Sequence, residues 1–188
     1  MMARMAMPTA AQLEAARGRL LPDVLPGPDD PALRVLFCGI NPGLVSAATG
    51  HHFARPGNRF WPVLHDSGFT PRLLRPDEQG ALPGWGLGIT NMAARPTARA
   101  DELTDAELLA GGEVLRALVE RLRPAWLAVV GLGAYRTAFA DRGAVVGAQE
   151  PTLAATRIWV LPNPSGLNAH WSRDMLTEEF ARLRAAAF

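Results

Sequence analysis

The sequence predicts an α/β protein with three layers, a three-layer α/β/α sandwich in which helices cover both faces of a short, mainly parallel central sheet. Strand-like and helix-like segments alternate along the chain, as they do where helical crossovers connect parallel strands. Apolar runs with strand character lie at 35–38, 126–130 and 158–161. The run at 126–130 is apolar throughout, which is typical of a central parallel strand buried on both faces.

Capping boxes predict where two helices begin. In each, a threonine is followed three residues later by Gln or Glu. Thr9 begins a first helix whose apolar positions continue to Leu20, and Thr104 begins an amphipathic helix that ends before Pro124. The other predicted elements are a Pro-rich linker at 21–31, helices at 58–67, from 134 and from 172, and a strand at 86–92.

Length and composition favour a single domain over 1–188. A chain of 188 residues, 48% of them hydrophobic, can bury one sizeable core. We expect an N-terminal helix and linker up to about residue 30, a core at 34–186, and a monomer. The N-terminal ten residues lack the apolar stretch of a signal peptide, and no run is long enough to span a membrane. We therefore expect a cytoplasmic protein.

Charge excludes a strongly basic nucleic-acid binder. All 19 basic residues are Arg, and 18 acids leave a net charge of +1. Within 55–75, however, Arg55, Arg59, Arg72 and Arg75 share the segment with one acid, Asp66. This pattern fits a phosphate-facing patch and a solvated Arg-rich face about equally well.

Cysteine and histidine usage predicts no metal and no cofactor. The one cysteine, Cys38, lies inside an apolar run and is expected to be a small buried hydrophobe. One cysteine allows no internal disulfide and no cysteine framework for zinc or an iron–sulfur cluster. The four histidines have no metal-like spacing with carboxylates. The segment 131–133 lacks the third glycine of a dinucleotide fingerprint, so we interpret it as a strand-to-helix turn.

Two Asn-bearing loops follow predicted strands. The segment 39–43 reads Gly-Ile-Asn-Pro-Gly, and the segment 163–168 reads Asn-Pro-Ser-Gly-Leu-Asn. In an open parallel sheet, the loops at the carboxyl ends of the strands form the ligand crevice. We therefore expect the two loops to share one site. Each loop alone also fits an ordinary turn.

Together with Phe53 and the Gly-Asn-Arg-Phe-Trp stretch at 57–61, these loops resemble the mismatch-specific uracil-DNA glycosylases, bacterial relatives of thymine-DNA glycosylase. The resemblance extends over 34–183. It implies the uracil-DNA glycosylase-like sandwich and no cofactor. It also implies a monofunctional DNA repair enzyme that flips uracil, and other damaged pyrimidines, out of double-stranded DNA where they are mispaired with guanine, and hydrolyses the N-glycosidic bond.

The resemblance assigns a role to individual residues of both loops. Asn41 would position the attacking water, Phe53 would stack on the flipped base, and Asn163 would contact the leaving base. Leu167 would enter the base stack as a wedge, although it could instead fold back into the core. The remaining assignments are base contacts at Ile40, Gly43 and Ser46 and DNA contacts at Arg59, Ser165, Gly166 and Asn168.

One position departs from the family pattern. Members commonly carry an Asp or Glu just before Arg95, where this chain has Ala94. If that acid orients or activates water, its absence lowers activity; alternatively the acid is structural and pairs with Arg95. The sequence therefore leaves open a catalytically weakened mismatch- or lesion-binding protein and, with less support, a generic α/β nucleotide-binding enzyme.

Overall fold

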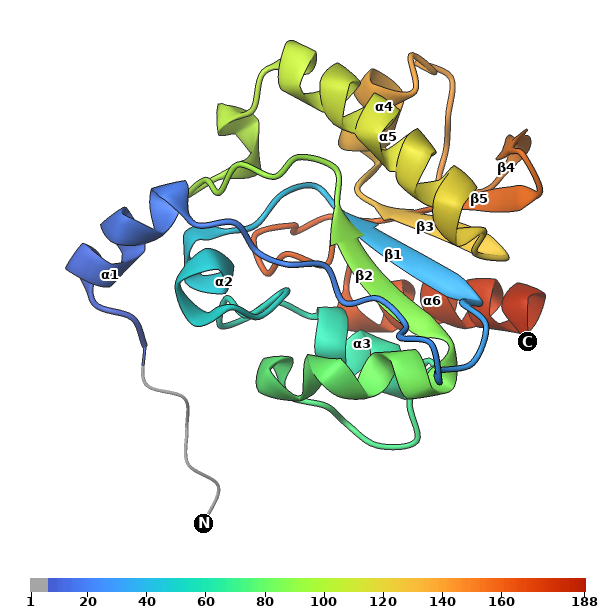
Figure 1. Cartoon of the computed structure of the whole chain (residues 1–188), viewed down its shortest axis with the longest axis horizontal. Helices are drawn as coiled ribbons and strands as arrows, with labels where there is room; N and C mark the ends of the chain where they lie inside the picture. The colour runs from blue at the N-terminus through green and yellow to red at the C-terminus, as the bar shows by residue number, and fades with distance from the viewer. Residues whose placement is uncertain (1–6) are drawn as a thin grey trace.

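The computed structural model describes residues 7–188, so the first six residues of the predicted N-terminal segment lie outside the described part (Figure 1). Its centre is a five-stranded sheet with the order β2-β1-β3-β5-β4. All neighbouring strands are parallel except β4, which is antiparallel to β5. The strands are β1 (Val35–Gly39), β2 (Leu87–Asn91), β3 (Trp126–Val130), β4 (Gly147–Leu153) and β5 (Thr156–Leu161).

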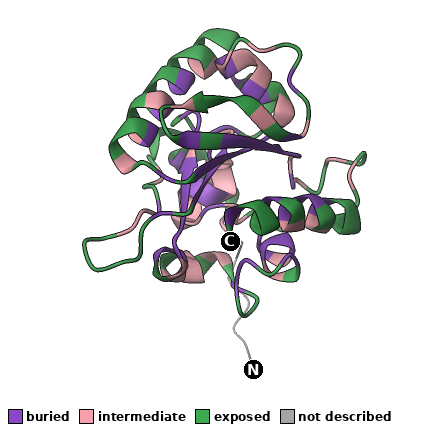
Figure 2. Cartoon of the chain, turned by 90° about the vertical axis from the view of Figure 1, so that its right-hand side faces the viewer, coloured by how far each residue is buried: buried purple, intermediate pink, exposed green. Residues whose placement is uncertain are grey.

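Strand β1 contributes side chains to both faces of the sheet, and every residue in it is buried (Figure 2). Val35 and Phe37 point into one hydrophobic core, whereas Leu36 and Cys38 point into the other, as the period of two in a strand requires. The prediction that Cys38 is a small buried hydrophobe is confirmed, because its side chain is fully buried in the second core.

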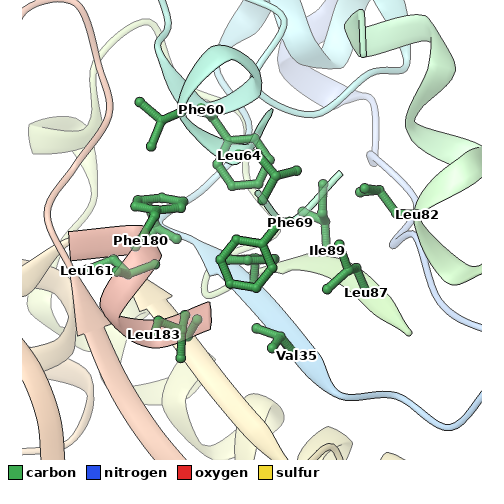
Figure 3. Close-up of a cluster of buried hydrophobic side chains, with 14 of the residues drawn as sticks. Val35, Phe60, Leu64, Phe69, Leu82, Leu87, Ile89, Leu161, Phe180 and Leu183 are labelled. Carbon is green, nitrogen blue, oxygen red and sulfur yellow. The ribbon is translucent and has the colours of Figure 1, made fainter. Parts of the chain in front are cut away.

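Helices cover both faces, so the predicted three-layer sandwich is confirmed (Figure 1). One core is closed by α3 (Phe60–Asp66) and α6 (Arg173–Ala187), and Figure 3 shows Phe60 and Leu64 of α3 in the same cluster as Phe180 and Leu183 of α6. The other is closed by α4 (Asp105–Leu122) and α5 (Leu132–Ala138). The shorter elements are α1 (Ala10–Ala15), η1 (Ala16–Gly18), α2 (Leu44–Thr49), η2 (Pro76–Trp85) and η3 (Ala100–Glu102).

The N-terminal segment differs from its prediction. Both halves of the capping box at Thr9 form, but α1 ends at Ala15, and Leu20 is 76% exposed. The predicted linker at 21–31 contains no helix or strand element, but Val24 within it exchanges two backbone hydrogen bonds of 2.8 Å with Ile89 of β2. The chain thus runs along the outer side of β2 (Figure 1) and covers that sheet edge.

Several elements were not predicted. α2 has six residues between Gly43 and Gly50, too short for a helical apolar pattern, and η2 contains Pro83. β4 contains Pro151 and is mostly exposed or half-exposed, so it has no apolar run. Its position at the sheet edge, paired with β5 alone, is where a polar strand with proline is tolerated.

The connections create a switch point beside β1. The chain passes from β1 to β2 on one side and then crosses over to β3 on the other side. Ligands of open α/β sheets bind at the carboxyl ends of strands where the order reverses in this way. Within residues 7–188, none of the helices combines the length and apolar character that a membrane crossing needs.

Candidate functional site

A cavity of about 570 Å³ opens at the carboxyl ends of the parallel strands. Its walls come from the loops after β1, β2 and β5 and from the last residue of β3. The prediction that the two Asn-bearing loops share one site is therefore confirmed. The predicted site residues that line the cavity are Ile40, Asn41, Gly43, Ser46, Phe53, Asn163, Ser165, Leu167 and Asn168, whereas Arg59, Ala94 and Gly166 do not line it.

The amide of Asn41 is fixed by two hydrogen bonds. Its Nδ2 donates to the carbonyl oxygen of Arg95 at 2.8 Å and to Oγ1 of Thr97 at 2.7 Å. Both protons of the amide nitrogen are thereby used, which leaves Oδ1 as an acceptor at the cavity. Asn41 can thus hold a water molecule by accepting its proton in a hydrogen bond.

Phe53 forms an aromatic wall of the cavity. One face of its ring stacks on Phe60 with a centroid distance of 3.9 Å, and the residue has a φ of +53°, which is rare outside glycine. A Cβ on Gly39 would lie 2.6 Å from Oδ1 of Asn91 and 3.3 Å from the Phe53 ring. Only glycine at the end of β1 leaves room for both of these groups. Backbone strain such as the positive φ of Phe53 is concentrated at functional sites in proteins.

The first loop is tied to the segment that follows β2. The carbonyl of Ile40 accepts from the amide of Ala93 at 2.9 Å, and that of Pro42 accepts from Thr97 at 3.1 Å. Ser46 is 5% exposed, and its Oγ accepts from the backbone amide of Ala54 at 3.2 Å. The polar wall around the cavity is thus rigid before any ligand enters.

The second loop is organised by its own side chains. Oδ1 of Asn163 accepts from the amide of Ser165 at 2.9 Å, and Asn168 donates from Nδ2 to the Asn163 carbonyl at 2.9 Å. The Asn163 amide nitrogen remains as a donor for the cavity. The side chain of Leu167 is 70% exposed at the cavity rim, so the alternative that it folds back into the core is excluded.

A hydrogen-bonded pair in the cavity wall, the buried His52 and the half-buried Asn91, was missed by sequence reasoning. Nε2 of His52 lies 2.9 Å from the Pro22 carbonyl, which can only accept, so Nε2 carries the proton. Nδ1 is then an acceptor, and Nδ2 of Asn91 donates to it at 3.3 Å. This orientation leaves Oδ1 of Asn91 as a further acceptor at the cavity. The sequence signal that could have identified Asn91 is its position, because it is the last residue of a strand, much as Asn41 closely follows one.

Ala94 lies on an adjoining cavity of about 750 Å³, which also contacts Pro42 and Asn91. Arg95 pairs with Glu107 at 2.6 Å and lowers the pKa of that carboxyl to about 2. Because Glu107 already pairs with Arg95, a carboxylate at position 94 is not needed for that purpose. Residue 94 stands between Ala93 and Arg95, whose backbones both bond to the first loop.

The four arginines of 55–75 do not form one cationic patch. Arg72 pairs with Glu78 at 2.7 Å and Arg75 with Asp77 at 3.0 Å. The guanidinium of Arg59 faces backbone carbonyls of the second loop. Arg55 is exposed and lines the cavity, so it is the member of the set best placed to meet a phosphate.

Within the described residues, Asp101 is the one carboxylate that lines the 570 Å³ cavity at the strand ends, and it pairs with Arg99 at 2.5 Å. The same part of the chain has no cluster of three or more His, Cys, Asp or Glu side chains that could hold a metal ion. The lining of the 570 Å³ cavity thus combines amides, hydroxyls and backbone groups with the Phe53 ring, the His52 imidazole and the charged side chains of Arg55, Arg99 and Asp101.

The fold and the cavity define an α/β protein with a rigid, amide-lined site at the switch point of its sheet. The family model of the Uracil DNA glycosylase superfamily matches residues 26–186, which is most of the chain. The chain belongs to the uracil-DNA glycosylase superfamily. Its members are glycosidic hydrolases of base excision repair that act on uracil in DNA.

The His52–Asn91 pair predicts a pH dependence of stability. Burial lowers the pKa of His52, with a smaller contribution from His51, against the opposing effects of the Pro22 carbonyl and Asp23. Below the ordinary histidine pKa of 6.5, the unfolded chain binds a proton that the folded chain excludes. The free energy of unfolding should therefore fall as pH decreases below that value, by at most about 1.4 kcal/mol per pH unit.

Urea unfolding between pH 8 and pH 5 measures this dependence, with His52→Gln as the comparison. The variant should show a flatter profile than the parent because it lacks the titrating ring. Parallel profiles for the two proteins would show that the pKa of His52 does not differ between the folded and unfolded states.

Proposed function

We propose that this glycosylase is mismatch-specific and monofunctional, and that it removes uracil and other damaged pyrimidines opposite guanine in double-stranded DNA. The observation that carries the proposal is the convergence of three groups on one cavity: the Asn41 acceptor, the Phe53 ring and the Asn163 donor. Such a cavity has room for a flipped base, and an enzyme must take a base out of the duplex before it can reach the anomeric carbon.

In this scheme the flipped base stacks on Phe53 and its polar edge meets the backbone near Ile40 and Gly43. A π-face holds any base, so stacking supplies affinity of roughly 1–3 kcal/mol without selectivity. Ser46 would lie beside carbon 5 of the pyrimidine and limit the substituents accepted there. Its burial and its bond to Ala54 give that wall little freedom to move.

Water is positioned rather than deprotonated. Asn41 accepts from the water through Oδ1, and its amide has no protonation equilibrium with which to remove a proton near neutral pH. A dissociative, oxocarbenium-like transition state asks little of the nucleophile, so orientation supplies the main contribution. The amide of Asn163 gives the departing base one neutral hydrogen bond, which favours bases that already leave well.

The second loop would fill the space that the flipped base leaves. Leu167 is an exposed apolar side chain between polar neighbours, which suits insertion into a base stack. Ser165, Gly166 and Asn168 flank it near the unpaired guanine. The chain contains no lysine, so no ε-amino group is present for a Schiff-base step, and simple hydrolysis is the expected reaction.

A second candidate is a mismatch- or lesion-binding protein with weak catalysis. Two observations favour it. In the described lining of the 570 Å³ cavity the one carboxylate, Asp101, forms an ion pair with Arg99, and position 94 is alanine. The two candidates share the cavity and the wedge. They differ in the rate of bond cleavage after binding.

A single-turnover cleavage assay beside a binding assay tests both, with duplexes that carry one G·U pair, one A·U pair or no uracil. We expect cleavage to be fastest on G·U. Tight G·U binding with no cleavage above the uncatalysed rate would favour the binding protein. No preference for G·U over A·U would contradict the mismatch specificity.

Asn41→Ala should lower the single-turnover rate constant on G·U by about 10² or more, which corresponds to roughly 3 kcal/mol of lost transition-state stabilisation. Duplex affinity should change little, because the amide orients water and does not hold DNA. Melting curves control for the two loop hydrogen bonds that the substitution also removes. Equal losses of binding and rate would assign Asn41 to loop structure.

Ala94→Asp should raise the rate constant on G·U well above that of the parent, because a carboxylate can orient and partly deprotonate water where a methyl cannot. Ala94→Asn is the matched control with the same shape and no charge. A gain in the Ala94→Asp variant alone supports activation of water, while no gain in either folded variant removes position 94 from the mechanism.

Leu167→Ala should leave thermal stability within about 0.5 kcal/mol of the parent, as is usual for surface changes. Duplex binding and excision should weaken together, because the unstacked duplex loses its filler. A single-stranded uracil substrate should lose much less. Equal losses on single and double strands would contradict the wedge role.

A further inference from the structure

The side chain of Arg59 donates hydrogen bonds to four backbone carbonyls of the loop that bears Leu167. We call residues 163–171, between β5 and α6, the wedge loop. Arg59 donates from its backbone amide to the Pro164 carbonyl at 3.0 Å and from Nε to the same oxygen at 3.3 Å. Its two terminal nitrogens donate to three further carbonyls of the loop, with distances of 2.6 Å to Ser165 and 3.0 Å to Asn168 and a shorter contact to Trp171.

These contacts bracket the tip. Ser165 and Asn168 lie on either side of Leu167, and a single guanidinium nitrogen, Nη2, donates to both of their carbonyls. The tip is also closed from within, because the amide of Asn168 donates to the Ser165 carbonyl at 2.9 Å. The carbonyls that face Arg59 thus fix the curvature of the loop, and Leu167 is held 70% exposed.

The support beneath the loop is rigid. Arg59 is the N-cap of α3, and the next residue, Phe60, is fully buried in the core. The backbone of the segment at 57–59 also touches the loop, since a Cβ on Gly166 would lie 2.6 Å from the Gly57 carbonyl oxygen. The loop therefore rests on an element that cannot shift without disturbing the core.

We propose that Arg59 is a positioning residue that preforms the wedge loop, and that it serves duplex recognition through Leu167 rather than by contact with a phosphate. This inference rests on the proposed function. A loop that had to become ordered on DNA would lose conformational entropy at the moment of binding, on top of the unfavourable unstacking of the duplex. A loop that is already fixed in the free protein avoids this loss of conformational entropy on binding.

The chemistry of the side chain explains the choice of arginine. A planar guanidinium presents donors in a fixed fork and can serve several carbonyls at once, whereas a lysine ammonium is a point charge with three donors. Arg59→Lys therefore keeps the charge that a phosphate contact needs but loses the fork that the loop needs. The two roles predict different results for this substitution.

The first experiment uses the free protein and needs no activity. Amide hydrogen exchange of the intact chain should be at least tenfold faster in Arg59→Lys for the wedge-loop amides of Ser165 and Asn168, both of which are hydrogen-bonded in the parent. Amides of β1 and β3 should be unchanged. Arg142→Met, which removes an exposed charge elsewhere, is the control. Unchanged exchange in the loop would overturn the proposal.

The second experiment measures G·U duplex binding and single-turnover excision for the same variants and for Arg59→Met. Arg59→Lys should lose at least tenfold in both, and in a Leu167→Ala background the same substitution should cost less than threefold, because the two residues act through one loop. The slope of log affinity against log salt should not change. A slope reduced by about one in Arg59→Met, with Arg59→Lys close to the parent in affinity, would assign a phosphate contact instead.

The two experiments separate this inference from the proposed function. Faster exchange in the loop without any preference of the parent protein for G·U duplexes would retain Arg59 as the support of the loop but refute mismatch specificity. A clear G·U preference of the parent protein, with loop exchange and G·U affinity unchanged in Arg59→Lys, would retain mismatch specificity but refute the role of Arg59.

Discussion

The site depends on how β1 is buried. Its side chains alternate between two cores, so neither the strand nor its carboxyl end can shift without opening one of them. At that end Gly39 leaves room for Asn91 of β2 and for the ring of Phe53, which lies between α2 and α3, and the chain then turns directly into the loop that bears Asn41. The rigid end of one central strand thereby anchors this loop.

The cavity is built from amides whose orientations are set by the protein. Asn41 and Asn91 each use the nitrogen end in a bond to the protein and present oxygen, whereas Asn163 uses its oxygen and presents nitrogen. An Asn side chain that is free to flip offers either a donor or an acceptor, so fixing one end selects the other. Such preorganised dipoles stabilise developing charge without reorganising.

Charge in this protein serves mostly internal structure. Arg95 closes onto Glu107 and orders the segment whose carbonyl fixes Asn41, while Arg59 serves the wedge loop. The net charge of +1 therefore understates how many guanidinium groups are already committed to the fold. Affinity for DNA is expected to come from Arg55, backbone groups and insertion of Leu167 more than from a broad basic surface.

Local signals in the sequence were sufficient to predict the sandwich. The apolar runs of β1, β3 and β5 indicate burial, and the capping boxes of α1 and α4 indicate where helices begin. The sequence also placed both Asn-bearing loops at one edge, since parallel strands end on the same side. The edge strand β4 and the pairing of Val24 with β2 were not predicted. Both depend on hydrogen bonds to a neighbouring strand, and their residues show no apolar pattern of their own. Which polar atoms of the site remain free to bind a ligand depends on contacts between distant parts of the chain. The two hydrogen bonds of the Pro22–His52–Asn91 chain join residues 30 and 39 positions apart, and Arg59 reaches carbonyls more than 100 positions away. Backbone carbonyls are the acceptors in most of these contacts, and every residue type carries one. No spacing of side chains in the sequence can therefore reveal that Arg59 faces a loop or that Asn91 faces the cavity. The exposure of Leu167, by contrast, follows from the wedge role that the sequence already assigned to it.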